Sequence, residues 1–161
     1  MIFVTVGTHT TGFNRLIDAV DAWAATANEE VVAQVGSSTS EPSHCRWFRF
    51  ASPEEIDRLM AEARIVVTHA GAGSLLRAIQ AGCTVVAVPR RAVHGESLDD
   101  HQFELCEALG EAGLVRPALD VEKLPAALSA GMPPTRVSDA PRADIVAAVR
   151  GALDDWAAPS W

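Results

Sequence analysis

The residues best suited to chemistry gather in two glycine-rich turns, of which the first is GTHTTG at 7–12. Its glycines are spaced as in a phosphate-binding P-loop, but Phe13 and Asn14 follow where that loop has its lysine and its hydroxyl residue. We therefore do not expect ATP or GTP hydrolysis by the P-loop mechanism. What remains is a turn into a helix N-terminus, which either holds an anion or serves only as a tight strand–helix connection.

The second turn is HAGAGS at 69–74. Gly71 and Gly73 indicate a close backbone approach or a positive φ, and Ser74 is placed to cap the next helix while its hydroxyl and amide face an anion. A dinucleotide-binding fingerprint does not fit, because Leu76 takes the place of the third glycine. Taken alone, such a turn is explained by packing, so its meaning depends on the residues around it.

A third group of polar residues, DDHQ at 99–102, stands where a helix is predicted to begin. The loop before it holds Arg90, Arg91, His94 and Glu96. Acids at a helix N-terminus are explained by the helix dipole alone, but Asp, His and Gln opposite two anion-binding turns also suit a ligand with many hydroxyls, such as a sugar. No histidine pair has the i, i+4 spacing of a metal site and no GxSxG motif is present, so neither a metal centre nor a serine hydrolase is expected.

The segments that must position these groups are short apolar runs alternating with helical patterns. Strands are predicted at 2–6, 31–35, 46–50, 65–68, 85–88 and 114–115. Helices are predicted at 13–27, 74–81, 101–110, 121–130 and 143–156, and one more begins after Ser52, where Ser52, Pro53 and Glu55 form a capping box with proline at the first helical position.

This alternation predicts an α/β fold, a Rossmann-like parallel sheet with helices on both faces, because each strand is apolar along its whole length. Such folds bind ligands outside the carboxyl ends of their strands. That edge collects the loops at 7–12, 36–40, 69–74 and 89–102.

Composition limits the class of protein. The 161 residues predict a single domain spanning 1–161, and 48% of them are hydrophobic, enough for a sizeable core. Lys and Arg number 13 against 21 Asp and Glu, and the net charge of −8 argues against a nucleic-acid partner. The three cysteines, Cys45, Cys83 and Cys106, form no CxxC pair, which favours a reducing compartment. Without an apolar stretch of about 18 residues or a leader pattern, we expect a cytoplasmic chain that only another protein holds at a membrane.

Several linked motifs together resemble a known family. They are VTVGTH (4–9), WFRFASPEEI (47–56), VVTHAGAGSLL (66–76), VVAVPR (85–90) and HGESLDDHQFELCEAL (94–109). In this order they resemble the C-terminal domain of family-28 GT-B glycosyltransferases, above all the stand-alone PssE-type subunit of bacterial two-component exopolysaccharide glycosyltransferases. That subunit is similar to the cytosolic subunit of the dolichol-linked N-acetylglucosaminyltransferase. The resemblance covers about residues 1–115; the remainder, with its closing helix at 142–156, matches only in being helical.

The resemblance implies half of a GT-B fold and a UDP-sugar-binding subunit of an inverting glycosyltransferase that needs neither a metal nor another cofactor. Such a subunit transfers a hexose-type sugar to a lipid-linked acceptor in polysaccharide biosynthesis. It works with a membrane-anchored, acceptor-binding partner of the PssD type, and so lies peripherally at the inner face of the membrane. Two other readings stay open: a non-catalytic docking module that has lost donor binding, and a nucleotide-sugar hydrolase whose site forms in a homodimer.

The same resemblance implies roles for individual residues. The residues expected to bind the diphosphate are Gly7, Thr8, Thr10, Gly71, Ala72, Gly73 and Ser74. Those expected to bind the uracil and ribose are Phe48, Phe50, Ala51 and Arg77. Those expected to bind the sugar are His94, Glu96, Asp99, Asp100, His101 and Gln102. The catalytic base is expected on the partner, with His9 as the candidate on this chain because an imidazole titrates near neutral pH.

Arg77 departs from the family pattern, since many relatives have an acidic residue there that binds the ribose hydroxyls. An arginine cannot accept those hydrogen bonds. Either the ribose is held otherwise, or Arg77 contacts phosphate, or the nucleotide preference differs. Half of a two-domain fold also predicts an exposed apolar surface around the loop at 90–97. The last helix, with Trp156 and Trp161, either adds to this surface or packs against the rest of the domain.

Overall fold

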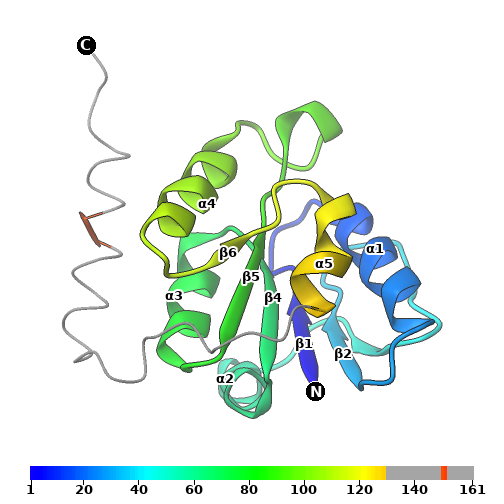
Figure 1. The fold of residues 1–161 in the computed structure, drawn as a ribbon. Helices are drawn as coiled ribbons and strands as arrows, with labels where there is room; N and C mark the ends of the chain where they lie inside the picture. Colours follow the sequence, from blue (N-terminus) through cyan, green and yellow to red (C-terminus); the bar gives the residue numbers. More distant parts are fainter. Residues whose placement is uncertain (130–149, 152–161) are drawn as a thin grey trace.

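The computed structural model describes residues 1–129 and 150–151 and shows a parallel sheet with helices on both faces (Figure 1). Its strands are β1 (Ile2–Thr5), β2 (Val31–Gln34), β3 (Arg46–Phe48), β4 (Ile65–His69), β5 (Thr84–Val88) and β6 (Arg116–Pro117). Its helices are α1 (Asn14–Ala24), α2 (Pro53–Glu62), α3 (Ala72–Gln80), α4 (His101–Glu111) and α5 (Leu124–Ser129), with short 3-10 turns η1 (Ala92–His94) and η2 (Val121–Lys123).

The six strands are all parallel and lie in the order β3-β2-β1-β4-β5-β6. The chain therefore winds outward from β1 in one direction through β2 and β3, then returns to the other side of β1 for β4 to β6. Folds of this kind bind ligands where the order reverses, at the carboxyl ends of the two central strands. Here those strands are β1 and β4, and both are followed by a glycine-rich turn.

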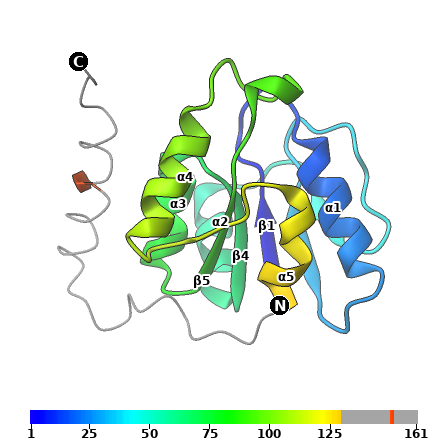
Figure 2. The same ribbon diagram turned by 45° about the horizontal axis from the view of Figure 1, so that its top comes forward.

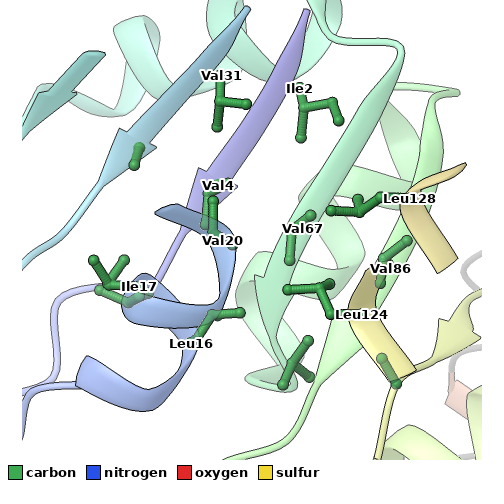
Figure 3. Packing of buried hydrophobic residues seen from close by; sticks show 14 of the residues in the cluster. Ile2, Val4, Leu16, Ile17, Val20, Val31, Val67, Val86, Leu124 and Leu128 are labelled. Atoms are coloured by element: carbon green, nitrogen blue, oxygen red, sulfur yellow. The ribbon is translucent and has the colours of Figure 1, made fainter. Parts of the chain in front are cut away.

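The core consists of two layers, one on each face of the sheet. On one face, α2, α3 and α4 pack against alternate strand residues such as Phe3 and Val66. On the other face, α1 and α5 lie side by side over Ile2, Val4 and Val67 (Figures 2 and 3). Because successive strand residues point to opposite faces, only strands that are apolar at every position can serve both layers. The predicted parallel sheet is confirmed.

Helix α2 begins as the sequence predicts. Its Ser52 hydroxyl accepts a hydrogen bond from the Glu55 amide at 3.3 Å, and Pro53 occupies the first helical position. The Glu55 carboxylate, however, binds Arg58 at 2.6 Å one turn further along the helix. The serine thus caps α2 as expected, while the glutamate that would complete the capping box forms an ion pair on the surface.

Several predicted boundaries are wrong: β3 ends at Phe48 and not at 50, and α1 spans Asn14–Ala24 and not 13–27. Strand β4 includes His69, and α3 begins at Ala72 with Gly71 as its N-cap, so Ser74 is the third residue of the helix and not its cap. The last strand is Arg116–Pro117 and not 114–115, because Gly113 at φ +70° ends α4 and the Leu114 amide still bonds the Leu109 carbonyl. The predicted helix at 142–156, including Trp156, and the terminal Trp161 lie outside the described residues, apart from 150–151.

Within the described part of the chain, no helix has the length and apolar character needed to traverse a lipid bilayer.

Candidate functional site

A cavity of about 730 Å³ opens at the carboxyl ends of β1 and β4, where the sheet order reverses. The turn after β1 contributes Gly7, Thr8, His9 and Thr10, and the start of α3 contributes Gly71, Ala72, Gly73, Ser74 and Arg77. Phe50, Ala51 and Ile56 form a further wall, and the strand ends add Thr5, Gln34 and His69. The structure thus brings together both glycine turns, as the sequence analysis expects.

The electrostatic character of this cavity favours an anion. Among the described residues that line it, none is acidic and Arg77 carries the one full charge, although the whole chain has a net charge of −8. The N-terminus of α3 opens into it, with Gly71 as an N-cap that makes no side-chain capping bond. Its first amides are therefore free to bind a ligand, and the helix dipole favours negative charge there.

Gln34, which the sequence analysis did not single out, fixes the first glycine turn. Its side chain is buried, and its Oε1 accepts hydrogen bonds from the Thr5 hydroxyl at 2.7 Å and the Gly7 amide at 3.1 Å. Its Nε2 donates to the Gly7 and Arg49 carbonyls, both at 2.9 Å. The sequence did offer a signal for this role, because Gln34 ends an otherwise apolar strand and a buried side-chain amide must be hydrogen-bonded.

His69 is the second residue that the sequence reasoning missed as a side chain. Its imidazole lies between the two glycine turns, and a Cβ at Gly7 or at Gly71 would come within 3.0 Å of the ring. Each glycine is thus required by the same imidazole, and Gly7 also has a φ of +73°. The expected close approach is confirmed at Gly71, although the spacing could not reveal which group approaches. At Gly73 the expectation is wrong, because an added Cβ would meet no described atom within 4 Å and the φ is not positive.

The His69 ring is a neutral group held inside the protein. Burial lowers its pKa to about 4, the charges of Arg90 and His9 act in the same direction, and the Thr5 carbonyl opposes them. Its Nδ1 is buried and has no hydrogen-bond partner among the described residues. A neutral imidazole of this kind carries one N–H, and the Thr5 carbonyl is an acceptor for it.

His9 is exposed at the mouth of the cavity, and its Nδ1 accepts a hydrogen bond from the Thr11 amide at 3.1 Å. The neutral ring then carries its proton on Nε2, so neither nitrogen is free to take up another. To act as a base, His9 would have to release the Thr11 amide. Its catalytic role stays a prediction.

The residues expected to bind uracil and ribose are partly brought together. Phe50, Ala51 and Arg77 line the cavity, whereas Phe48 is half-buried in β3 and packs against the core formed with α2 and α3. The Arg77 guanidinium binds the Asp57 carboxylate on α2, with Nε and Oδ1 3.2 Å apart, and both side chains are partly exposed. Arg77 therefore lines the cavity, while its ion-pair partner Asp57 does not.

The six expected sugar ligands lie away from the larger cavity. His94 and Glu96 line a smaller one of about 410 Å³, on the far side of the first turn. Asp100 accepts hydrogen bonds from the Ala92 amide at 3.0 Å and from Arg91 Nε at 3.2 Å. Gln102 accepts one from the Arg90 amide at 3.2 Å, and Asp99 binds its neighbour His101. These bonds shape the loop after β5, and sugar binding by these residues stays a prediction.

The described residues contain no group of three or more His, Cys, Asp or Glu that could hold a metal ion.

Comparison with known proteins adds the following. The model of the "Glycosyltransferase family 28 C-terminal domain" matches residues 1–151. The chain is 32% identical over 122 residues to the mouse (Mus musculus) UDP-N-acetylglucosamine transferase subunit ALG13, and 30% identical over 123 residues to the human (Homo sapiens) protein. These matches cover 69% and 70% of this chain but 10% of each relative, so the chain spans about a tenth of the length of these curated relatives.

Two solved structures share the fold. The glycosyltransferase of kitacinnamycin superposes with a TM-score of 0.60 and the calicheamicin glycosyltransferase CalG4 with 0.59, each at 19% sequence identity. Both matches cover 96% of this chain, and 39% and 38% of the respective structures. At this identity the likeness shows the fold alone. The present chain corresponds to less than half of each of these two larger proteins.

Proposed function

Because the chain belongs to the glycosyltransferase family 28 C-terminal domain family, we propose that it binds the UDP-sugar donor of a glycosyltransferase. The observation that carries the proposal is the cavity at the carboxyl ends of β1 and β4, with its two glycine turns, the N-terminus of α3 and no acid among the described residues that line it. Such a cavity suits a diphosphate. The relatives' printed name, a UDP-N-acetylglucosamine transferase subunit, supports UDP as the nucleotide.

In the proposed arrangement, the diphosphate lies against the amides of Gly71 to Ser74, and the uracil lies along Phe50 and Ile56. Transfer of the sugar leaves UDP with additional negative charge on its terminal phosphate. The helix dipole of α3 and the amides at its start stabilise that charge, which is how such a site can act without a metal. The reaction inverts the anomeric centre, and the base is supplied by the other half of the site.

We propose that this other half is a separate, membrane-anchored subunit of the PssD type that binds a lipid-linked acceptor in polysaccharide biosynthesis. The chain corresponds to under two fifths of the solved glycosyltransferases, and its named relatives are subunits. Val93 and Leu98, on the loop after β5, are 76% and 101% exposed. That loop stands at the carboxyl edge of the sheet (Figures 1 and 2), where an apolar surface for a missing half was expected.

The function is tested by thermal unfolding of the purified chain with UDP, ADP, GDP and NAD side by side. At about 100 times its dissociation constant, UDP should add about 2.7 kcal/mol to the free energy of unfolding, and the other nucleotides should add much less. A stronger shift with another nucleotide would replace UDP as the ligand. No shift with any nucleotide, alone or with the co-expressed partner, would contradict donor binding.

Exchange of Arg77 for glutamate is expected to lower UDP affinity about tenfold, or about 1.4 kcal/mol. The change removes the one full charge of the cavity wall and places a carboxylate opposite the diphosphate. Asp57→Asn is the matched control, because it breaks the same ion pair but leaves the guanidinium in place, and it should keep or raise the affinity. Isothermal titration calorimetry measures both.

Arg77 is also the observation that favours a second candidate function, a docking module that has lost donor binding. If Arg77→Glu gained UDP affinity, the arginine would be shown to obstruct the site, and the docking module would become the better conclusion. A loss of affinity would show that the chain uses the arginine.

A further inference from the structure

Arg90 is a charged residue in the interior of the protein, next to the cavity but outside its lining. It is 1% exposed. Its guanidinium donates to the Gly12 carbonyl at 2.9 Å and to the Val6 carbonyl at 3.1 Å, one on each side of the first glycine turn. It also lies over the ring of Phe13, 4.8 Å from the ring centre. The Arg90 side chain thus holds both ends of the first glycine turn from the protein interior.

Within the part of the chain that the structure describes, Arg90 has no hydrogen bond to a carboxylate. Its third acceptor is the Glu96 carbonyl at 3.4 Å, and its Nε is buried with no partner among the described residues. The Glu96 carboxylate is taken up by Arg15, with both pairs of atoms 2.9 Å apart, and by the Arg91 amide at 3.0 Å. The guanidinium therefore keeps its charge, which burial does not remove from an arginine, without a directly bound counter-charge.

The neighbouring arginines have carboxylate partners of their own. Arg15 binds Glu96 and Arg91 binds Asp100, so each of these two charges is paired where that of Arg90 is not. The charge of Arg90 acts on His69, whose pKa it helps to lower, and His69 lines the cavity. A buried charge without a carboxylate partner is costly for folding. The Glu96 carboxylate acts on Arg90 without binding it, and an anion bound in the cavity would add a second counter-charge.

We propose that Arg90 is a positioning residue for the anion site: it fixes the first glycine turn and supplies a permanent positive charge beneath the ligand's phosphates. That the ligand is UDP rests on the proposed function. That the Arg90 charge strengthens binding applies to any anion in the cavity, and it can be tested without a nucleotide. Because the charge acts through the low-dielectric interior, its effect grows with the negative charge of the ligand and nearly vanishes for a neutral one.

The test compares Arg90→Met and Arg90→Lys with the wild type for binding of UDP, uridine and inorganic pyrophosphate. Arg90→Met should lower the affinity for UDP and pyrophosphate about tenfold and that for uridine less than about threefold. Arg90→Lys keeps the charge but not the three carbonyl bonds, so it should lose stability and retain the preference for UDP over uridine. Arg64→Met is the control, since it removes the same charge from an exposed pair with Glu29 and should change neither ratio.

A second readout needs no ligand. Titration of His69 by NMR should show its pKa rise towards the ordinary value in Arg90→Met and stay low in Arg64→Met, because only the first change removes a charge that acts on the ring. The inference is overturned if His69 in Arg90→Met titrates as in the wild type, if Arg90→Met weakens UDP and uridine equally, or if Arg90→Lys loses the preference for UDP over uridine. If the wild type binds pyrophosphate but not UDP, the proposed function fails while the inference is judged on pyrophosphate; if it binds neither, both fail. If Arg90→Met does not fold, Arg90→Lys and its UDP-to-uridine ratio decide.

Discussion

Replacement of Gly71 by alanine is expected to abolish measurable UDP binding and to lower the free energy of unfolding by about 1–3 kcal/mol. Gly71 has a φ of −79° and a ψ of 128°, which any residue adopts, so the backbone tolerates the change. The new Cβ, however, would overlap the His69 imidazole. The ring cannot move away from Gly71 because the Gly7 backbone lies on its other side, so close that a Cβ added to Gly7 would be 2.5 Å from the ring. Gln34 holds that backbone in place through the Gly7 amide. The ring must turn into the cavity, where the diphosphate is proposed to lie.

Gly73→Ala is the matched control, because no atom lies within 4 Å of the Cβ it would add. In a helix this change should leave stability equal or raise it by up to about 1 kcal/mol. Removal of the imidazole in the double variant with His69→Ala should restore part of the stability lost by Gly71→Ala, with a coupling energy above about 1 kcal/mol. Calorimetry and urea unfolding measure these effects. Wild-type stability and affinity in Gly71→Ala would show that the ring is not confined.

The sheet could be predicted from sequence because its signals are local and agree with one another. Strands such as β1 and β4 are apolar at every position, which only a sheet covered on both faces requires. The glycine turns follow those strands directly, so parallel pairing brings them to one edge whatever the lateral order. Ser52 and Pro53 likewise mark the start of α2 through contacts within one helical turn.

The side chains of the site could not be predicted in the same way, because their partners come from distant parts of the chain. The spacing of Gly71 showed that something approaches closely, but the approaching ring of His69 is placed by the registers of β1 and β4. The Glu96 carboxylate binds Arg15 from the first turn of α1, a contact across 81 positions of the sequence that no local pattern indicates, and its contact with a sugar stays a prediction. Ser74 was expected to cap α3, and the helix begins before it because Gly71 can serve as the N-cap.

Acidification is expected to destabilise the protein through His69. Burial, Arg90 and His9 lower the pKa of this imidazole from 6.5 to about 4 in the folded state. Between these values the unfolded chain binds a proton that the folded chain excludes, so stability falls as the pH falls from about 6.5 towards 4 and is unaffected above that window. From pH 8 to pH 5 the loss due to His69 is about 2 kcal/mol.

His69→Gln isolates this effect, since glutamine keeps a polar side chain but does not titrate. Urea unfolding at pH 8 and pH 5 should show the wild type losing about 2 kcal/mol more than the variant. Carboxylates with lowered pKa values, such as Glu29 beside Arg64, lose their contribution only in more acidic solution and are common to both proteins. Equal losses in the two proteins would mean that His69 is protonated readily in the folded state. The cavity floor would then carry a charged imidazole at pH 5, and anion binding would strengthen on acidification by a route that the neutral ring described above does not offer.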